Sequence, residues 1–334
     1  MTRTISIASF FSLIPSVLLA HHSVSGFFDT DSIIEREGEV VAVYWRNPHV
    51  RFTVNVQNES GSIDLYEIET TSLVNLRRRK LTTDFLKTGD RIRIAGNPAK
   101  DEKLGIYALN ILLPMGEEVI LGGGGNRRWA GETIGNTQQN RLGDPSEPGL
   151  GIFRVWSTPL GSGPLYAGNF PLTEAASRSV ESFDPAIDSP TLNCAPKGMP
   201  TIMEQPYPML IREEDDTIVF EIEEYDTIRV IHMTSDTTSQ TPETPRLGYS
   251  IGQWERETLV VETFNASWPH FNRDGIPLSS DASIIEYFDL AENGSQLNYR
   301  MTITDQANFT APVTLEKHWV WYPEVTIEPY DCIF

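Results

Sequence analysis

Three histidines near the start of the chain have the residue type and position best suited to metal chemistry. If residues 1–20 are removed as an export segment, His21 comes first and offers a metal both its α-amino group and a ring nitrogen. His22 follows directly, and His49 is a third candidate ligand. This nitrogen-rich set favours copper over zinc, because neither cysteine nor a carboxylate cluster accompanies it. The alternative is a solvated N-terminus with His49 as a turn residue.

A second group of residues could carry out acid/base chemistry in the C-terminal half. Glu223 and Arg229 lie on neighbouring predicted strands and would form a buried charged pair if both faced the inside of a barrel. His232, Glu286 and His318 lie on other predicted strand segments and could face the same cavity. The alternative is an edge of solvated carboxylates with one structural ion pair, because alternation does not say which strand face is exposed.

No familiar catalytic motif accompanies these residues. The sequence has no serine nucleophile elbow and no His-Glu-Xaa-Xaa-His zinc motif. The glycine run at 122–125 lacks the lysine and the flanking strand and helix that a phosphate-binding loop needs. Both candidate sites therefore depend on the elements that position them.

Residues 1–20 have the character of an export signal. Arg3 is their only charged residue, and an apolar run extends from Ile5 to Ala20. The run is too short and too interrupted for a membrane span. We therefore expect a periplasmic or secreted protein without a transmembrane span after signal removal. Cleavage after Ala20 would leave Leu18 where a small residue is preferred, which weakens the choice of that bond.

The chain is strongly acidic, with a formal net charge of −20 over 334 residues. Such a chain repels nucleic acid phosphates and anionic lipid surfaces. We therefore expect no nucleic acid partner, and instead a small-molecule ligand or a protein partner in the cell envelope.

The two cysteines, Cys194 and Cys332, both lie in the second half of the chain. An even pair in an exported chain favours a disulfide, which would tie the entry of the second domain to its last residues. The alternative is two unpaired buried thiols.

Residues 21–113 predict a small β-barrel domain. Strands are expected at 37–45, 49–56, 63–70, 91–95 and 106–113, with a short helix at 72–80 capped by Ser72. Five or six short strands with one helix resemble an oligonucleotide/oligosaccharide-binding (OB) barrel.

The remainder of the chain predicts a linker and a larger barrel. Residues 114–170 are rich in Gly, Pro, Asn and Gln, and only 151–157 has the character of a strand, the first of the next domain. Residues 171–334 contain about eight strands at regular spacing after a helix at 173–183. This pattern predicts an antiparallel barrel or bent sheet, lipocalin-like in general form. The fold class is therefore mostly β.

Several segments resemble known exported bacterial proteins. The first domain is similar to a family of small secreted proteins without established function, through His21-His-Ser, Trp45-Arg-Asn-Pro-His49, Leu86-Lys-Thr-Gly-Asp90 and Pro98-Ala-Lys-Asp101. The second resembles a domain found in similar exported proteins, through Cys194-Ala-Pro-Lys-Gly-Met-Pro200, Pro206-Tyr-Pro208, Gly248-Tyr-Ser-Ile-Gly-Gln-Trp254 and Leu259-Val-Val-Glu262. It departs at Arg256-Glu257, where Gly-Asp is expected. The resemblance implies an exported two-domain β protein and no reaction.

Two functions follow as hypotheses. The first is an exported binding protein that holds copper at its mature N-terminus and a small ligand in its C-terminal barrel. The second is an enzyme that uses acid/base chemistry, such as hydrolysis, elimination or isomerisation, in the C-terminal barrel through Glu223, Arg229, His232 or Glu286.

Overall fold

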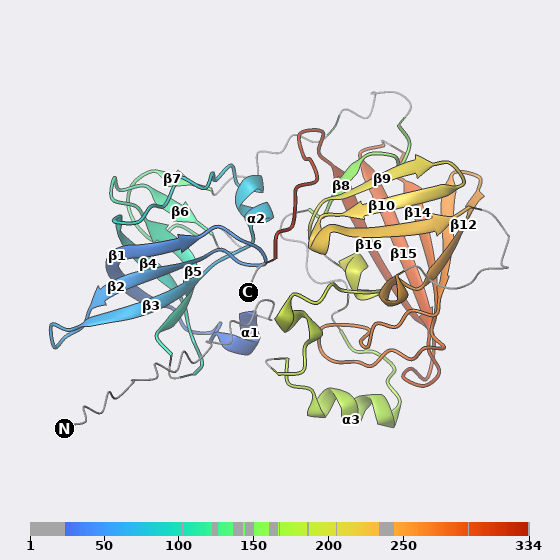
Figure 1. Ribbon diagram of the computed structural model, residues 1–334, viewed down its shortest axis with the longest axis horizontal. Coiled ribbons are helices and arrows are strands. Elements are labelled where there is room, and N and C mark those ends of the chain that lie inside the picture. Colours follow the sequence, from blue (N-terminus) through green and yellow to red (C-terminus); the bar gives the residue numbers. More distant parts are fainter. Residues whose placement is uncertain are drawn as a thin grey trace, which may run out of the picture.

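The computed structural model shows two β-barrels (Figure 1). It describes residues 24–332 without 102, 122–125, 136–142, 144–149, 160–165, 167, 186, 205, 234–243 and 293. The predicted export segment and the two N-terminal histidines, His21 and His22, lie outside the described residues.

The first barrel has five strands and the expected OB-like arrangement. In the sheet, β1 pairs with both β2 and β4, and β5 closes the barrel by pairing in parallel with β3. The strands are β1 (Ile34–Tyr44), β2 (Arg51–Gln57), β3 (Ile63–Glu69), β4 (Arg91–Pro98) and β5 (Gly105–Leu112). The prediction of a small barrel is confirmed.

Alternation along the strands explains why this segment forms a barrel. On β2, Phe52, Val54 and Val56 are buried, whereas the residues between them are not. Close strand approach requires glycine at one point of β4, because a Cβ on Gly96 would lie 2.1 Å from the Tyr107 carbonyl oxygen. The barrel core is therefore built from the inward face of each strand.

The expected helix between β3 and β4 is present as α2 (Leu73–Arg78). The Ser72 side chain accepts a hydrogen bond from the Asn75 backbone N–H at 3.4 Å, as predicted for the cap. A short helix, α1 (Val24–Phe27), precedes β1.

The sheet of the first barrel continues into the segment that we expected to be a linker. Strand β6 (Glu118–Ile120) pairs with β5, and β7 (Thr133–Ile134) pairs with β6. Glu118 is fully buried and accepts hydrogen bonds from the Asn110 side chain and from the backbone of Arg128 and Trp129. One carboxylate thus organises a glycine-rich segment that composition alone makes look irregular.

The second barrel has nine strands and is closed. Neighbouring strands are consecutive in sequence, except that β8 lies between β16 and β9 and closes the ring. All pairs are antiparallel apart from β11–β12, which is parallel, so the expected meander is interrupted once. The strands are β8 (Val155–Ser157), β9 (Met209–Glu214), β10 (Thr217–Ile222), β11 (Thr227–His232), β12 (Tyr249–Glu255), β13 (Thr258–Phe264), β14 (Ser283–Leu290), β15 (Gln296–Thr304) and β16 (Val313–Trp321).

Short helices accompany the second barrel. The predicted helix at 173–183 is α3 (Glu174–Ser182), and Thr173 caps it by accepting from the Ala176 N–H. Four single turns of 3₁₀-helix complete the described elements: η1 (Pro190–Asn193), η2 (Thr201–Glu204), η3 (Glu224–Asp226) and η4 (Pro245–Leu247).

The interior of the second barrel is filled by large side chains. Trp156, Phe220, Phe288, Tyr299 and Trp319 are all less than 2% exposed and belong to one continuous core. Their rings contact one another, with centroid distances of 5.0 Å for Phe288–Tyr299 and for Tyr299–Trp319. Around these rings, the barrel is a packed core.

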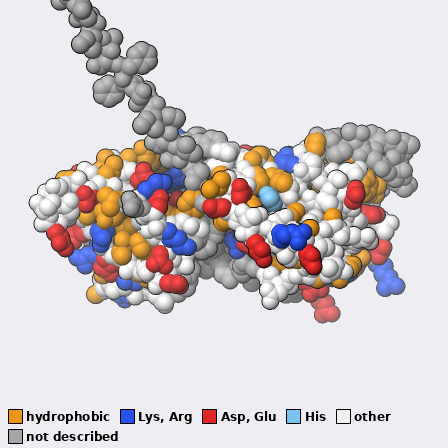
Figure 2. Space-filling model, turned by 90° about the horizontal axis from the view of Figure 1, so that it is seen from below, with side chains coloured by type: hydrophobic (Ala, Val, Ile, Leu, Met, Phe, Trp, Pro, Cys, Tyr) orange, Lys and Arg blue, Asp and Glu red, His pale blue; other side chains and the backbone are white. Residues whose placement is uncertain are grey.

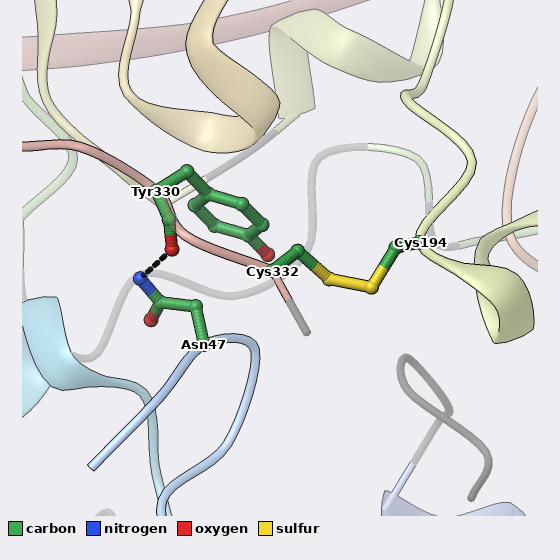
Figure 3. The surroundings of a disulfide bond; sticks show 4 residues. All are labelled: Asn47, Cys194, Tyr330 and Cys332. Carbon is green, nitrogen blue, oxygen red and sulfur yellow. Dashed lines mark hydrogen bonds between the residues drawn. A yellow bond between two sulfur atoms is a disulfide. The ribbon is translucent and has the colours of Figure 1, made fainter. Parts of the chain in front are cut away.

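A C-terminal tail, residues 322–332, runs between the two barrels (Figure 1). It is held by the Cys194–Cys332 disulfide, which confirms the predicted pairing (Figure 3). Beside that bond, the buried Asn47 of the first barrel donates to the Tyr330 carbonyl oxygen at 2.7 Å (Figure 3). The tail therefore joins the domains through both a covalent bond and a buried hydrogen bond.

No helix in the described part of the chain is both long and apolar enough to cross a membrane.

Candidate functional site

His49 lies just before β2 with its ring held by a backbone carbonyl. Its Nδ1 is 2.8 Å from the Thr70 carbonyl oxygen and 3.3 Å from Oε1 of Glu69. Because a carbonyl only accepts, Nδ1 carries the proton, and in the neutral ring the lone pair is on Nε2. Histidines that bind metals through Nε2 have this arrangement, with Nδ1–H donated to a carbonyl or carboxylate. His49 therefore has the tautomer that a ligand requires, although the same contacts also suit a structural residue.

The segment that follows the N-terminal histidines lies near His49. The rings of Phe28 and His49 both contact the Tyr107 ring, at centroid distances of 5.6 and 6.3 Å. Phe28 is fixed there by an isolated bridge to Ala99, and α1 precedes it directly. The first described residue, Val24, is two positions after His22.

The described residues alone do not complete a metal site. Among them, no group of three or more His, Cys, Asp or Glu side chains is arranged to hold a metal ion. His21 and His22, the other ligands predicted from sequence, lie outside the described residues.

Two of the four predicted acid/base residues meet inside the second barrel. Arg229 and Glu286 are almost fully buried, and the guanidinium donates through both terminal nitrogens to the carboxylate, with Nη1–Oε1 at 3.0 Å. The Tyr299 hydroxyl donates to the same Oε1 at 2.8 Å, and Arg229 Nη2 also donates to Oγ1 of Thr263 at 2.9 Å.

Electrostatics keeps the Tyr299 hydroxyl of this cluster protonated. Burial and the Glu286 carboxylate raise the pKa of Tyr299 well above its usual value, so the phenol stays a hydrogen-bond donor. Phe220, Phe288 and Trp319 surround the cluster with apolar surface. The arrangement resembles a buried structural ion pair more than a site open to substrate.

The other predicted acid/base residues lie elsewhere. Glu223 is fully buried between the domains, where its Oε1 accepts from Nη2 of Arg77 at 2.6 Å. Burial raises its pKa, and the Arg77 charge opposes that shift. On β11, His232 lies on the opposite face from the inward-facing Arg229 and Ile231. Its ring stacks on the Tyr249 ring, with 4.7 Å between the centroids.

His318 lies on β16, between the inward-facing Lys317 and Trp319, and its side chain is exposed. The structure therefore brings Arg229 and Glu286 together but separates both from Glu223, His232 and His318.

Sequence reasoning missed Lys317 as a perturbed group. Its Nζ lies 4.5 Å from the Trp319 ring and donates to the Met203 carbonyl oxygen at 3.2 Å. Burial lowers the pKa of Lys317 to about 7, partly offset by the Glu204 carboxylate. The sequence did carry a signal for this group, because Lys317 shares one face of its strand with Trp319 and Trp321.

Comparison with known proteins adds one match. A family described as a family of unknown function (DUF6152) matches residues 13–107, which run from the predicted export segment through the first barrel to the start of β5. No curated protein matches the chain. Over its first domain, and including all three candidate histidines, the chain is thus similar to a family of unknown function.

Proposed function

We propose that this is an exported binding protein whose first domain binds copper through His21, His22 and His49. The observation that carries the proposal is the Nδ1–H of His49 donated to the Thr70 carbonyl oxygen at 2.8 Å, with the Glu69 carboxylate beside it. This contact orients the ring for ligation through Nε2. Cleavage before His21 would supply an amine and two further rings.

The remaining geometry supports binding at the surface of the molecule. Side chains fill the barrel centre around Arg229 and Glu286, and the charges of these two residues neutralise each other. For the same reason no specific contact favours the acid/base enzyme, whose residues lie in separate places. We therefore assign the second barrel the role of holding the first domain, with the ligand or envelope partner outside the core.

The test is titration of the processed protein with Cu(II) by calorimetry, after mass spectrometry has established its first residue. Replacing His49 with Gln should weaken binding by at least roughly tenfold, as for the loss of one ligand or its outer support. The matched control is His318→Gln, because His318 is an exposed histidine on the second barrel.

Two further variants test the geometry. Adding one residue before His21 moves the amine away while keeping every ring, and should weaken binding strongly. Glu69→Gln keeps the size of the side chain that supports His49 and should weaken binding less than His49→Gln.

The affinity for Cu(II) should also fall as the pH decreases, because an α-amino group with a pKa near 8 must lose its proton to bind. Equal Cu(II) affinity in the parent, the extension and His49→Gln would refute the proposal.

A further inference from the structure

A small cavity lies between the two domains, beside the end of α2. Its volume is about 110 Å³, well below the several hundred Å³ of sites for drug-sized ligands. One wall is part of the first domain and the other is formed by the C-terminal tail together with the loop before β9. The lining residues are Val74, Arg77, Arg78, Pro208, Glu324, Val325, Thr326 and Glu328.

Arg78 is a buried cation in this wall. The Glu223 carboxylate attracts its charge, but the described residues use only part of its hydrogen-bonding capacity. The residue is 3% exposed, and of its three guanidinium nitrogens only Nη2 has a protein acceptor, the Pro206 carbonyl oxygen at 2.8 Å. Its Nε is buried without a hydrogen-bond partner, and no described carboxylate forms an ion pair with Arg78. Burial lowers the pKa of Arg78 to about 10. Buried donors are normally hydrogen-bonded, so the Nε of Arg78 could donate to a ligand as its partner.

The other charges that line the cavity have partners. Arg77 pairs with the buried Glu223 at 2.6 Å, and Glu324 pairs with Lys80 at 3.5 Å. Glu328 accepts a hydrogen bond from the Thr326 hydroxyl at 2.8 Å. Within the described part of the wall, the unsatisfied group is therefore a hydrogen-bond donor with a positive charge.

We propose that this interdomain cavity binds a small carboxylate through the guanidinium of Arg78. Carboxylate oxygens accept from guanidinium N–H groups in a planar, charge-assisted geometry, which suits a guanidinium whose Nε lacks an acceptor among the described residues. The size of the cavity restricts the ligand to a few heavy atoms. Both a simple carboxylic acid and a small amino acid carry this group, and only the amino acid would also bring an ammonium toward Glu328.

The experiment measures binding of acetate and of glycine to the full-length processed protein by calorimetry, with chloride keeping the ionic strength constant. We expect saturable acetate binding with a dissociation constant on the order of 1 mM. Replacing Arg78 with Gln should weaken it at least roughly tenfold. Arg93→Gln is the matched control, because Arg93 pairs with Glu37 on an exposed face of the first barrel.

A second variant covers the case in which Arg78→Gln does not fold. Val325→Trp should fill the cavity while leaving the arginine in place, and should abolish acetate binding. Tighter binding of glycine than of acetate would identify an amino acid as the ligand, and the reverse order a simple carboxylic acid. Acetate binding that is undetectable in the parent, or unchanged in both Arg78→Gln and Val325→Trp, overturns the proposal.

Discussion

Arg229 and Glu286 show how one buried contact fixes the protonation and position of its neighbours. Both terminal nitrogens of Arg229 donate to the Glu286 carboxylate, which also accepts from Tyr299, and Nη2 of Arg229 donates to Thr263 as well. Such a pair contributes little net stability against apolar residues of the same size, whereas removing one partner leaves a buried charge alone. Its loss should therefore be costly and strongly non-additive.

Glu286→Leu and Arg229→Met should each destabilise the protein by about 3–5 kcal/mol, because each leaves the other residue uncompensated. The double variant Arg229→Met/Glu286→Leu should cost less than the sum of the two. Urea unfolding measures all three. Glu221→Gln is the control, because Glu221 pairs with Arg212 at the exposed surface of the same barrel and should cost no more than about 1 kcal/mol. Additive costs for the two buried residues would contradict this account.

The individual residues also show where sequence reasoning stops. Alternation put Glu286 and Arg229 on strands but did not decide which face points inward, and it could not show that Glu223 pairs with Arg77, 146 positions away. Glu223 directly follows β10, where alternation ends, and its partner belongs to the other domain. Likewise, the donor–acceptor relation of His49 and Thr70 depends on how β2 and β3 meet.

At the scale of elements, the C-terminal tail holds the domains together. Tyr330 donates its backbone N–H to Oδ1 of Asp226 at 3.0 Å and accepts from Asn47 through its carbonyl oxygen. The Glu328 N–H donates to Oε2 of Glu223 at 3.2 Å. Each of these bonds lies at the boundary between the domains.

Asn47→Ala should cost about 1–3 kcal/mol, because it leaves the Tyr330 carbonyl oxygen and the Leu73 N–H without the buried amide that satisfies both. Asn55→Ala, an exposed asparagine on β2, is the matched control and should change stability little. Denaturant unfolding followed by tryptophan fluorescence gives both values. An equal loss in the two variants would show that the contact does not stabilise the interface.

Most strands and both predicted helices were found from sequence because their signals are local. Period-two alternation and the caps at Ser72 and Thr173 depend on neighbouring residues alone. The strands β6 and β7 were missed because short pieces within a glycine-rich segment have too few residues to alternate. The parallel pairing of β11 with β12 was missed as well, because register between strands depends on tertiary contacts.

At the scale of the whole molecule, the net charge and the fold of the first barrel predict different kinds of partner. OB-like barrels are frequent nucleic acid binders, but this chain has a net charge of −20. On the face seen in Figure 2, acidic and basic side chains are interspersed over both lobes, and no broad basic surface is seen. The net charge therefore disfavours the electrostatic attraction on which nucleic acid binding depends.

We expect no binding of a labelled 20-nucleotide single-stranded DNA at about 50 mM salt, where electrostatic attraction is strong. Fluorescence anisotropy measures this directly. A dissociation constant tighter than about 100 µM, the range of non-specific binding, would contradict the prediction.

The position of β8 has a further consequence, for the order in which the molecule folds. This strand pairs Trp156 with Trp321 and with Met209, so the second ring is complete only after the chain from 156 to 321 has returned on itself. In the first barrel, the closing pair joins residues 67–69 to 105–107. Closing a long loop costs more entropy, and contacts between distant positions slow folding. The barrel that carries His49 should therefore acquire its native form first, while its larger neighbour is still open.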